Sequence, residues 1–235
     1  MDMKDFLNVL ASKEPVPGGG GACGYVAAVG MALGNMVLSL TTGKKKYAEY
    51  QEEIEELIVK AGDITNRLYE CMDKDAKAFK PLSEAYGLPK DTEEQLEHRN
   101  KVMENALLIA SEAPLSMMEL IVEAIKLIDR ISVIGSRLAI SDAGVGVQMC
   151  KAAHNGASLN MYINTGKTKI KRLIVFRDNP PHNGGMPCGA CREFLMQLDK
   201  ANKNMEILTD YETRTTIKLS EVLPNWWGNK RYDNN

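Results

Sequence analysis

The sequence predicts a mainly α protein, namely an antiparallel helical bundle with a small α/β appendage of strand, helix and strand at its C-terminal end. Three observations lead to this prediction. Long stretches up to about residue 164 have apolar residues three and four positions apart. Short joints containing Gly or Pro separate these stretches, as in bundles. After Gly166 the pattern changes to two short strand-like runs around one helical stretch. We therefore expect two domains, 1–165 and 166–235.

The first two predicted helices flank a glycine-rich joint. The first covers about 3–12 and stops before Pro15 and Pro17. The second, about 22–40, is almost free of charge and long enough to span a bilayer at ~1.5 Å per residue. Small residues recur along it at every fourth position, at Gly20, Gly24, Ala28 and Ala32. Such a stripe lets a second helix approach closely, and we interpret this segment as a buried core helix with no membrane partner.

Three longer helices complete the predicted bundle. One covers 44–86, and Pro81 is expected to kink or interrupt it. The next starts at a cap at Asp91 or Thr92, and Pro114 is expected to break it in two. The last covers 135–155 and is followed by a short apolar stretch. Because the joints are short, neighbouring helices should run antiparallel.

Charge and cysteine content restrict the partners and the compartment. Lys and Arg number 29 against 31 Asp and Glu, a net charge of −2, which argues against nucleic acid and anionic membranes as partners. The N-terminus is charged and is not followed by a signal-peptide pattern. The five cysteines are Cys23, Cys71, Cys150, Cys188 and Cys191. An odd number does not suit a secreted disulfide framework, so we expect a cytoplasmic protein.

Two features near the second helix have the chemistry to bind an anion. The glycine run Gly18, Gly19, Gly20 leaves the first backbone N–H groups of that helix free and open to a ligand. Alternatively, the glycine run is an ordinary turn between packed helices. The lysines Lys44, Lys45 and Lys46 oppose the positive end of the helix that follows them. A bound anion would relieve that repulsion, and a solvated charged corner is the alternative.

Three aspartates are candidate functional groups. Asp73 and Asp75 are two positions apart in one helix and so do not face each other. Asp75 lies one turn from both Cys71 and Phe79, which predicts that its face is the more buried. Asp142 stands among small and apolar residues. A buried carboxylate is costly without a partner, which makes these positions candidates for function.

Five motifs occur in order over about residues 3–164. They are Pro17-Gly18-Gly19-Gly20, the run from Leu40 to Tyr47, the run from Asp73 to Phe79, Leu88-Pro89-Lys90, and the run from Ala139 to Val145. Together they resemble the formiminotetrahydrofolate cyclodeaminase / methenyltetrahydrofolate cyclohydrolase family. The resemblance implies an all-helical, dimer-forming bundle that binds a tetrahydrofolate as its substrate, without a metal or other cofactor.

The same resemblance suggests roles for the candidate residues. Cyclodeamination needs one group to take a proton from N10 and another to protonate the leaving nitrogen, and cyclohydrolysis adds water to the same bridging carbon. We expect catalysis from the carboxylates Asp142 and Asp75, with Asp73 as a further candidate. We expect substrate binding from Gly18, Gly19, Gly20 and Ser141, and from Lys44, Lys45 and Lys46 toward the anionic tail.

The chain departs from the family pattern at two places. Gly21 stands where the family commonly has Ser, and Gly135-Ser136-Arg137-Leu138 stands where it often has Gly-Asn-x-Asn. The missing hydroxyl and amide groups would otherwise help to orient a substrate. These two departures leave open an alternative function, in which the protein binds folate or mediates assembly without catalysing a reaction.

The appendage carries a different motif. Its strands are predicted at 172–176 and 206–209, with a helix at 188–198 between them. Pro187-Cys188-Gly189-Ala190-Cys191-Arg192 resembles the second half of cytidine deaminase, in which both cysteines bind zinc. That family also needs an upstream Cys- or His-Ala-Glu, which this sequence lacks. A zinc-dependent nucleoside deaminase is therefore an alternative function, and the missing tripeptide argues against it. Cys188 and Cys191 would be metal ligands only if zinc is bound. His182 or Cys150 would then be the candidate for a further ligand.

Overall fold

A computed structural model describes residues 2–165, 168–175 and 185–228, and the side chains of 162–165 are not described. Residue contacts divide the chain into two compact units, Met1–Thr165 and Gly166–Asn235. The first unit is helical and the second holds a small sheet, which confirms the predicted mainly α class with an α/β appendage. Each unit has its own hydrophobic core.

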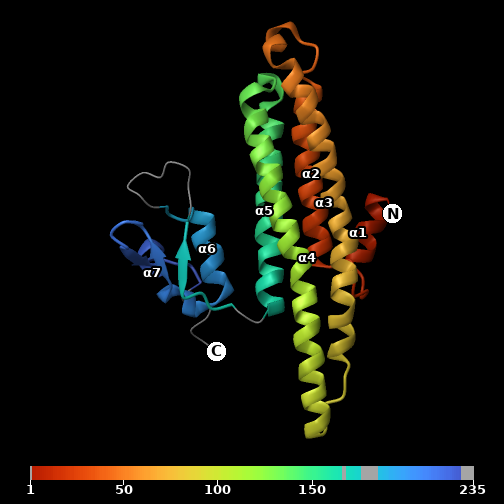
Figure 1. Cartoon of the computed structure of the whole chain (residues 1–235), viewed down its shortest axis with the longest axis vertical. Coiled ribbons are helices and arrows are strands. Elements are labelled where there is room, and N and C mark those ends of the chain that lie inside the picture. The colour runs from red at the N-terminus through yellow and green to blue at the C-terminus, as the bar shows by residue number, and fades with distance from the viewer. Residues whose placement is uncertain (1, 166–167, 176–184, 229–235) are drawn as a thin grey trace. The chain divides into compact units, whose positions relative to one another are not determined.

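The first unit is a four-helix bundle with one short helix added at its N-terminal end (Figure 1). Its helices are α1 (Met3–Leu10), α2 (Gly19–Ser39), α3 (Gln51–Tyr86), α4 (Glu93–Ile134) and α5 (Ile140–Thr165). In the bundle α2 packs mainly on α3 and α5, and α4 packs on the same two helices from the other side. The joints between consecutive helices are short, so each helix runs antiparallel to its neighbours, as predicted.

Helix α2 forms the centre of the core. It is the single helix among the described residues that is long and apolar enough to cross a membrane, and half of its most apolar window is buried inside the bundle. Its buried residues, including Ala27, Met31 and Leu38, face the other helices, while Ala32 and Met36 are exposed. The apolar residues of α2 therefore extend beyond the face that is buried within one chain.

Glycines allow α2 and α5 to approach backbone to backbone. A Cβ added to Gly30 would lie 2.7 Å from the carbonyl oxygen of Gly146 and 2.9 Å from Sγ of Cys150. A Cβ added to Gly146 would lie 2.5 Å from the carbonyl oxygen of Gly30. The stripe predicted on α2 instead faces α3, where Gly20 meets Asp75 and Gly24 meets Leu68, so a different glycine, Gly30, forms the close contact with α5.

We expect Gly30→Ala to destabilise the bundle by about 1–3 kcal/mol, because the new methyl group would push the two backbones apart. Gly62→Ala is the matched control, since a Cβ at that helical position meets nothing within 4 Å. The control should gain about 0.4–1 kcal/mol from the lower entropy of its unfolded state. Chemical denaturation followed by the helical circular dichroism signal measures both, and a Gly30→Ala protein as stable as the Gly62→Ala protein would contradict the proposed packing.

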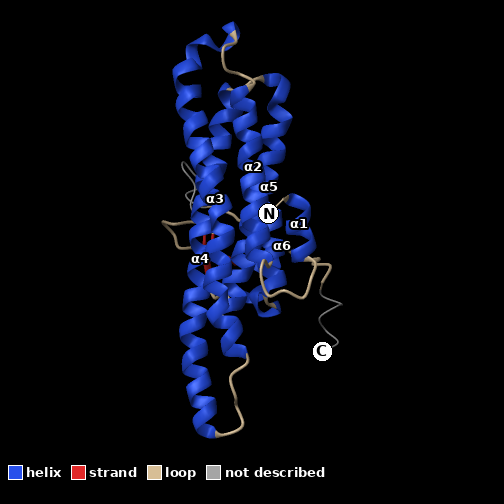
Figure 2. Ribbon diagram, turned by 90° about the vertical axis from the view of Figure 1, so that its right-hand side faces the viewer, coloured by secondary structure: helices blue, strands red, loops and turns tan. Residues whose placement is uncertain are grey.

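The two internal prolines do not interrupt their helices, which corrects the predicted break at Pro114 and, of the two outcomes predicted at Pro81, excludes the interruption. Helices α3 and α4 each continue through their proline. Both helices are much longer than α2, and together they extend beyond it at one end of the unit (Figures 1 and 2). There they form a second apolar cluster around Leu82, Ala85 and Ala106. A proline costs about 3 kcal/mol in a helix interior, and packing on both sides of it offsets that cost.

The start of α4 and the end of α2 follow the expected capping chemistry. The side chain of Thr92 accepts a hydrogen bond from the backbone N–H of Gln95, and Oε1 of Gln95 accepts one from the backbone N–H of Thr92. Gly43 turns the chain after α2 with φ of +73°, a left-handed conformation that favours glycine. At the far end, α5 continues to Thr165, which corrects the prediction that it ends at 155.

The second unit is a three-stranded sheet with helices. Strands β1 (Arg172–Ile174) and β2 (Glu206–Leu208) are parallel and are joined through α6 (Gly189–Leu198), as the predicted strand-helix-strand order requires. A third strand, β3 (Thr216–Lys218), pairs antiparallel with β2 and leads into α7 (Leu219–Val222). The sequence analysis missed β3, because three residues carry too little alternation to mark a strand.

Candidate functional site

The N-terminal end of α2 holds a carboxylate directly against its glycines. Asp75 projects from α3 so that a Cβ added to Gly20 would lie 2.1–2.3 Å from the carboxyl atoms. The backbone N–H of Gly21 donates a hydrogen bond to the same carboxyl group. The glycine run was expected to admit a ligand, and at Gly20 the room that a side chain would need is taken by Asp75 itself.

Burial makes Asp75 an unusual carboxyl group. Desolvation raises its pKa above the ordinary value, and the hydrogen bond from Gly21 opposes this only in part. Asp75 is half-buried while Asp73 is exposed, as the helical spacing predicted. A carboxyl group with a raised pKa is a better proton donor and acceptor near neutral pH than an exposed one.

A small cavity of about 120 Å³ opens beside this carboxylate. Its walls come from the Pro15–Val16 segment, the three glycines, Asp75 and Phe79 of α3, and Asn160 of α5. The amide of Asn160 would lie 3.3 Å from a Cβ added to Gly19, so it faces the glycine run across the cavity. The cavity thus combines a carboxyl group, an amide and the N-terminus of a helix, which suits a polar ligand that exchanges protons.

Asn160 is the residue that sequence reasoning missed. It stands in the stretch 159–163 that was expected to follow the last helix rather than to belong to it. Asn160 reaches the cavity because α5 continues past residue 155 to Thr165. A polar amide within an apolar helical stripe was the available signal.

Burial also shifts the pKa values of a thiol and an imidazole group in the bundle. Burial, with a smaller contribution from the charge of Asp75, raises the pKa of Cys23 to about 11. Burial also lowers the pKa of His154, which lies inside α5. Both shifts disfavour the charged form of the group.

The first departure from the family pattern, Gly21, lies inside this site. Its backbone N–H donates a hydrogen bond to Asp75, and a residue of any other type except proline could donate the same bond. A Cβ added to it would lie 3.1 Å from Cβ of Pro17. A serine here would therefore need Pro17 to move by a few tenths of an ångström, and glycine lets the 15–18 segment lie closer to α2.

The lysine corner forms a second group of candidate residues. Lys44, Lys45 and Lys46 are exposed and follow the C-terminal end of α2. Nζ of Lys44 lies 3.4 Å from Oγ of Ser136, and the backbone N–H of Ser136 donates to Oγ1 of Thr41 at 2.8 Å. These bonds join the lysine corner to the start of α5.

Asp142 and Ser141 stand in the first turn of α5, at this same end of the bundle. Ser141 is exposed and Asp142 is half-buried. A carboxylate in the first turn also stabilises the helix dipole, which is the structural alternative for Asp142. Leu138, one of the positions at which the chain departs from the expected family pattern, is 92% exposed at this end of the bundle.

The two groups lie at opposite ends of one bundle. Helix α2 separates the glycine run from the lysine corner, and its 21 residues span ~31 Å. Asp142 and Asn160 are ~27 Å apart along α5 on the same reckoning. One chain therefore brings Asp75 to the glycines, but it does not bring Asp142 or the lysines to them.

The thiol pair of the second unit lies at the start of α6. Sγ of Cys188 lies 2.8 Å from Sγ of Cys191 and accepts a hydrogen bond from the Cys191 backbone N–H. Among the described ranges 2–165, 168–175 and 185–228, no three His, Cys, Asp or Glu side chains gather as a metal site would require. Cys150 is buried in the core of the first unit, and His182 lies outside the described residues.

The match to a known family covers the bundle and the first residues of the second unit. A family model described as formiminotransferase-cyclodeaminase matches residues 2–174. The methenyltetrahydrofolate cyclohydrolase of Methylorubrum extorquens is 38% identical over 162 residues, which are 69% of this chain and 78% of that protein. The resemblance of residues 187–192 to cytidine deaminase lies outside the family match and stays a prediction.

Two further relatives carry the cyclodeaminase name. The formimidoyltransferase-cyclodeaminase of Mus musculus is 28% identical over 180 residues, which are 77% of this chain and 33% of the mouse protein. This chain therefore spans about a third of that relative. The crystal structure of formiminotetrahydrofolate cyclodeaminase from Thermotoga maritima superposes with a TM-score of 0.62 at 26% identity, over 71% of this chain and 79% of that one.

Proposed function

This chain belongs to the formiminotransferase-cyclodeaminase family, and from that membership we propose that it is an enzyme acting on a tetrahydrofolate at the bridge between N5 and N10. The activity is that of a formiminotetrahydrofolate cyclodeaminase, a 5,10-methenyltetrahydrofolate cyclohydrolase, or both. The observation that carries the proposal is the half-buried Asp75 carboxyl group, held against Gly20 by the Gly21 N–H beside an open cavity.

The chemistry of Asp75 suits both reactions. In cyclodeamination N10 attacks the formimino carbon and loses its proton, and the bond from that carbon to the imino nitrogen breaks as ammonia leaves. In cyclohydrolysis water adds to the same carbon of the methenyl cation, and the bond from that carbon to N5 then breaks to give the 10-formyl product and a proton. A single carboxyl group with a raised pKa can accept the first proton and return one to the leaving nitrogen.

The amide of Asn160 and the N-terminus of α2 complete the proposed reaction centre. The amide can donate to or accept from the substrate nitrogen on the far side of the cavity from Asp75. The positive end of the helix dipole lowers the cost of keeping Asp75 ionised after it has returned its proton. We propose that these groups act without a metal or a cofactor other than the folate substrate.

We further propose that the enzyme is a homodimer in which two chains share each site. The p-aminobenzoyl-glutamate tail of a folate is anionic, which suits Lys44, Lys45 and Lys46, yet these lie ~31 Å from the glycines within one chain. A second chain placed antiparallel would bring its lysine corner and Asp142 to the Asp75 end of the first. A two-fold axis would then form two equal sites.

An exposed face between the two ends supports this arrangement. Along α2 and α5 it is small and apolar, with a shallow depression of about 630 Å³. Val145 is 48% exposed there, and Ser141 and Gly144 are exposed beside it. Exposed apolar patches of this kind are typical of interfaces. Cys23, Cys71 and Cys150 are free thiols, which is consistent with the further proposal of a cytoplasmic protein.

The absorbance of the methenyl chromophore tests the proposed function. We expect the purified chain to consume 5,10-methenyltetrahydrofolate, to form it from 5-formiminotetrahydrofolate with release of ammonia, or to do both. Folate binding without either reaction would instead favour the non-catalytic alternative. Stoichiometric zinc together with turnover of cytidine would favour the nucleoside deaminase.

A further inference from the structure

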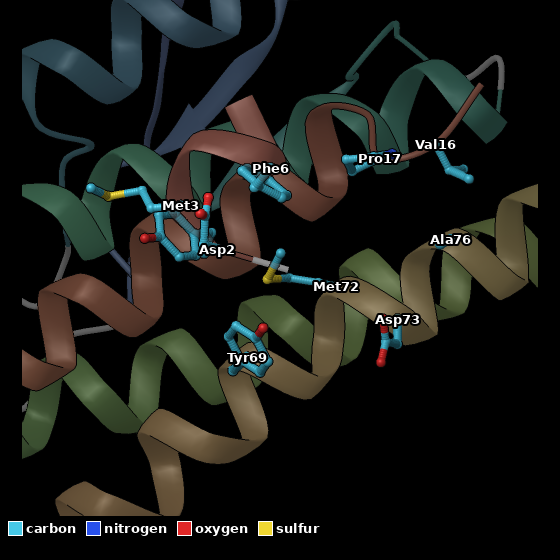
Figure 3. A pocket seen from close by; sticks show the side chains of 10 residues that line it. Asp2, Met3, Phe6, Val16, Pro17, Tyr69, Met72, Asp73 and Ala76 are labelled. Carbon is cyan, nitrogen blue, oxygen red and sulfur yellow. The ribbon is translucent and has the colours of Figure 1, made fainter. Parts of the chain in front are cut away.

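A larger cavity lies next to the Asp75 cavity and has no role in the function proposed above. It measures about 650 Å³ and is enclosed by α1, the segment before α2, α2 itself and α3 (Figure 3). Phe6 and Pro17 lie on one side of it, and Tyr69, Met72 and Asp73 lie along α3 on the other. It is therefore a space between three helices that opens to the surface.

The lining suits a flat aromatic ligand. The rings of Phe6 and Tyr25 stack with their centroids 5.3 Å apart, and Tyr69 adds a third aromatic side chain that is 51% exposed. The thioether of Met72 supplies a polarisable contact between them. Aromatic and thioether groups bind planar rings through stacking and dispersion.

The charge of the lining further restricts the ligand. The lining includes two carboxylates, Asp2 and Asp73, and no Lys, Arg or His. Asp2 is already engaged, because it accepts the backbone N–H of Asp5 at 2.7 Å and caps α1. Within the part of the chain that the structure describes, Asp73 has no hydrogen bond or ion pair. It is free to accept N–H groups from a ring, and the cavity would repel an anion.

The two cavities are neighbours across one short segment. Val16 lines both of them, Pro15 lines the smaller and Pro17 the larger. Asp73 and Asp75 are two positions apart on α3, so that Asp73 lines the larger cavity and Asp75 lines the smaller one. A ligand ring in the larger cavity would thus lie next to the cavity that Asp75 lines, with Val16 in the wall that the two cavities share.

We propose that the larger cavity binds the pteridine ring of the folate, with Asp73 accepting hydrogen bonds from its 2-amino group and N3–H. This rests on the proposed function. N5 belongs to the pteridine ring and N10 is attached to it through one carbon, so the ring of a substrate reacting at Asp75 must lie beside that residue. Asp73 is then a positioning residue and not a catalytic one.

The kinetic signature of Asp73→Asn tests the proposal. Because Asp73 would hold the ring equally in the ground state and in the transition state, KM for 5,10-methenyltetrahydrofolate should rise about tenfold or more, while kcat changes little. Asp129→Asn is the matched control, since it makes the same charge change at an exposed position on α4, and it should leave KM unchanged.

Two fragments of the substrate make the test specific to the ring. 6-Methyltetrahydropterin should inhibit competitively, and Asp73→Asn should weaken its inhibition by the same factor as it raises KM. p-Aminobenzoyl-glutamate should inhibit both proteins equally. An unchanged KM, or an equal weakening of both inhibitors, would overturn the assignment of the ring to this cavity.

A failure of the proposed function gives a different result. If the wild-type protein turns over no folate, calorimetric titration with 6-methyltetrahydropterin still shows whether the larger cavity binds a pterin ring. Binding that is lost in Asp73→Asn and kept in Asp129→Asn supports the pteridine site, and no binding to the wild-type protein overturns it.

Discussion

Replacing Asp75 by Asn is expected to lower kcat/KM for 5,10-methenyltetrahydrofolate by about 10²–10⁴-fold, the range for loss of a general acid–base group. The amide has nearly the same shape and can still accept the Gly21 N–H, so the site should keep its geometry. What it loses is the ability to take and return a proton. Stopped-flow absorbance of the methenyl chromophore measures the rate.

The same variant should be at least as stable as the wild-type protein. Burial raises the pKa of Asp75 in the folded state above its value in the unfolded chain. The folded state therefore binds more protons than the unfolded state as pH rises from about 3.9 through the raised pKa, and wild-type stability falls over this window. Asn carries no such penalty, so the advantage of Asp75→Asn should appear above that window and vanish below pH about 3.9.

These two outcomes separate a catalytic role from a structural one. Asp129→Asn is the control, and it should change neither the rate nor the pH dependence of unfolding by urea. A stable Asp75→Asn protein with a rate near that of the wild type would remove Asp75 from the mechanism. A protein that loses its helical signal would instead show that the carboxylate is needed for folding.

Mixing two inactive variants is expected to restore about a quarter of the wild-type activity. Asp75→Asn damages one end of the bundle and Asp142→Asn damages the other, and each homodimer should be inactive. Random reassociation after mild unfolding makes about half of the dimers mixed. Each mixed dimer has one intact site out of two when every site takes Asp75 from one chain and Asp142 from the other.

A control pair makes this result specific. Asp75→Asn mixed with Asn160→Ala places both defects in the same cavity, so every shared site in every dimer remains damaged and no activity should return. Native mass spectrometry verifies that mixed dimers have formed. Their formation without any recovery of activity in the first mixture would contradict the shared site.

Helix positions were predictable because they depend on neighbours in the chain. Apolar spacing located the helices of the bundle, and the cap at Thr92 was confirmed with its reciprocal partner Gln95. The same local spacing identified Asp75 as the more buried of the two neighbouring aspartates. Local preference was wrong at Pro114, because packing of α4 on α3 and α5 outweighs the lost backbone hydrogen bond.

By itself the sequence determined the fold class, the change of character at Gly166 and the resemblance to a folate family, since each depends on residue order and local spacing. Only the tertiary structure decided which candidates meet. It placed Asp75 against Gly20 in a cavity that Asn160 also lines, it placed Asp73 at a separate aromatic cavity, and it left Asp142 at the far end. The physical reason is that a helix carries its residues ~1.5 Å apart along a straight axis, so the distance between two side chains depends on which ends of which helices pack together.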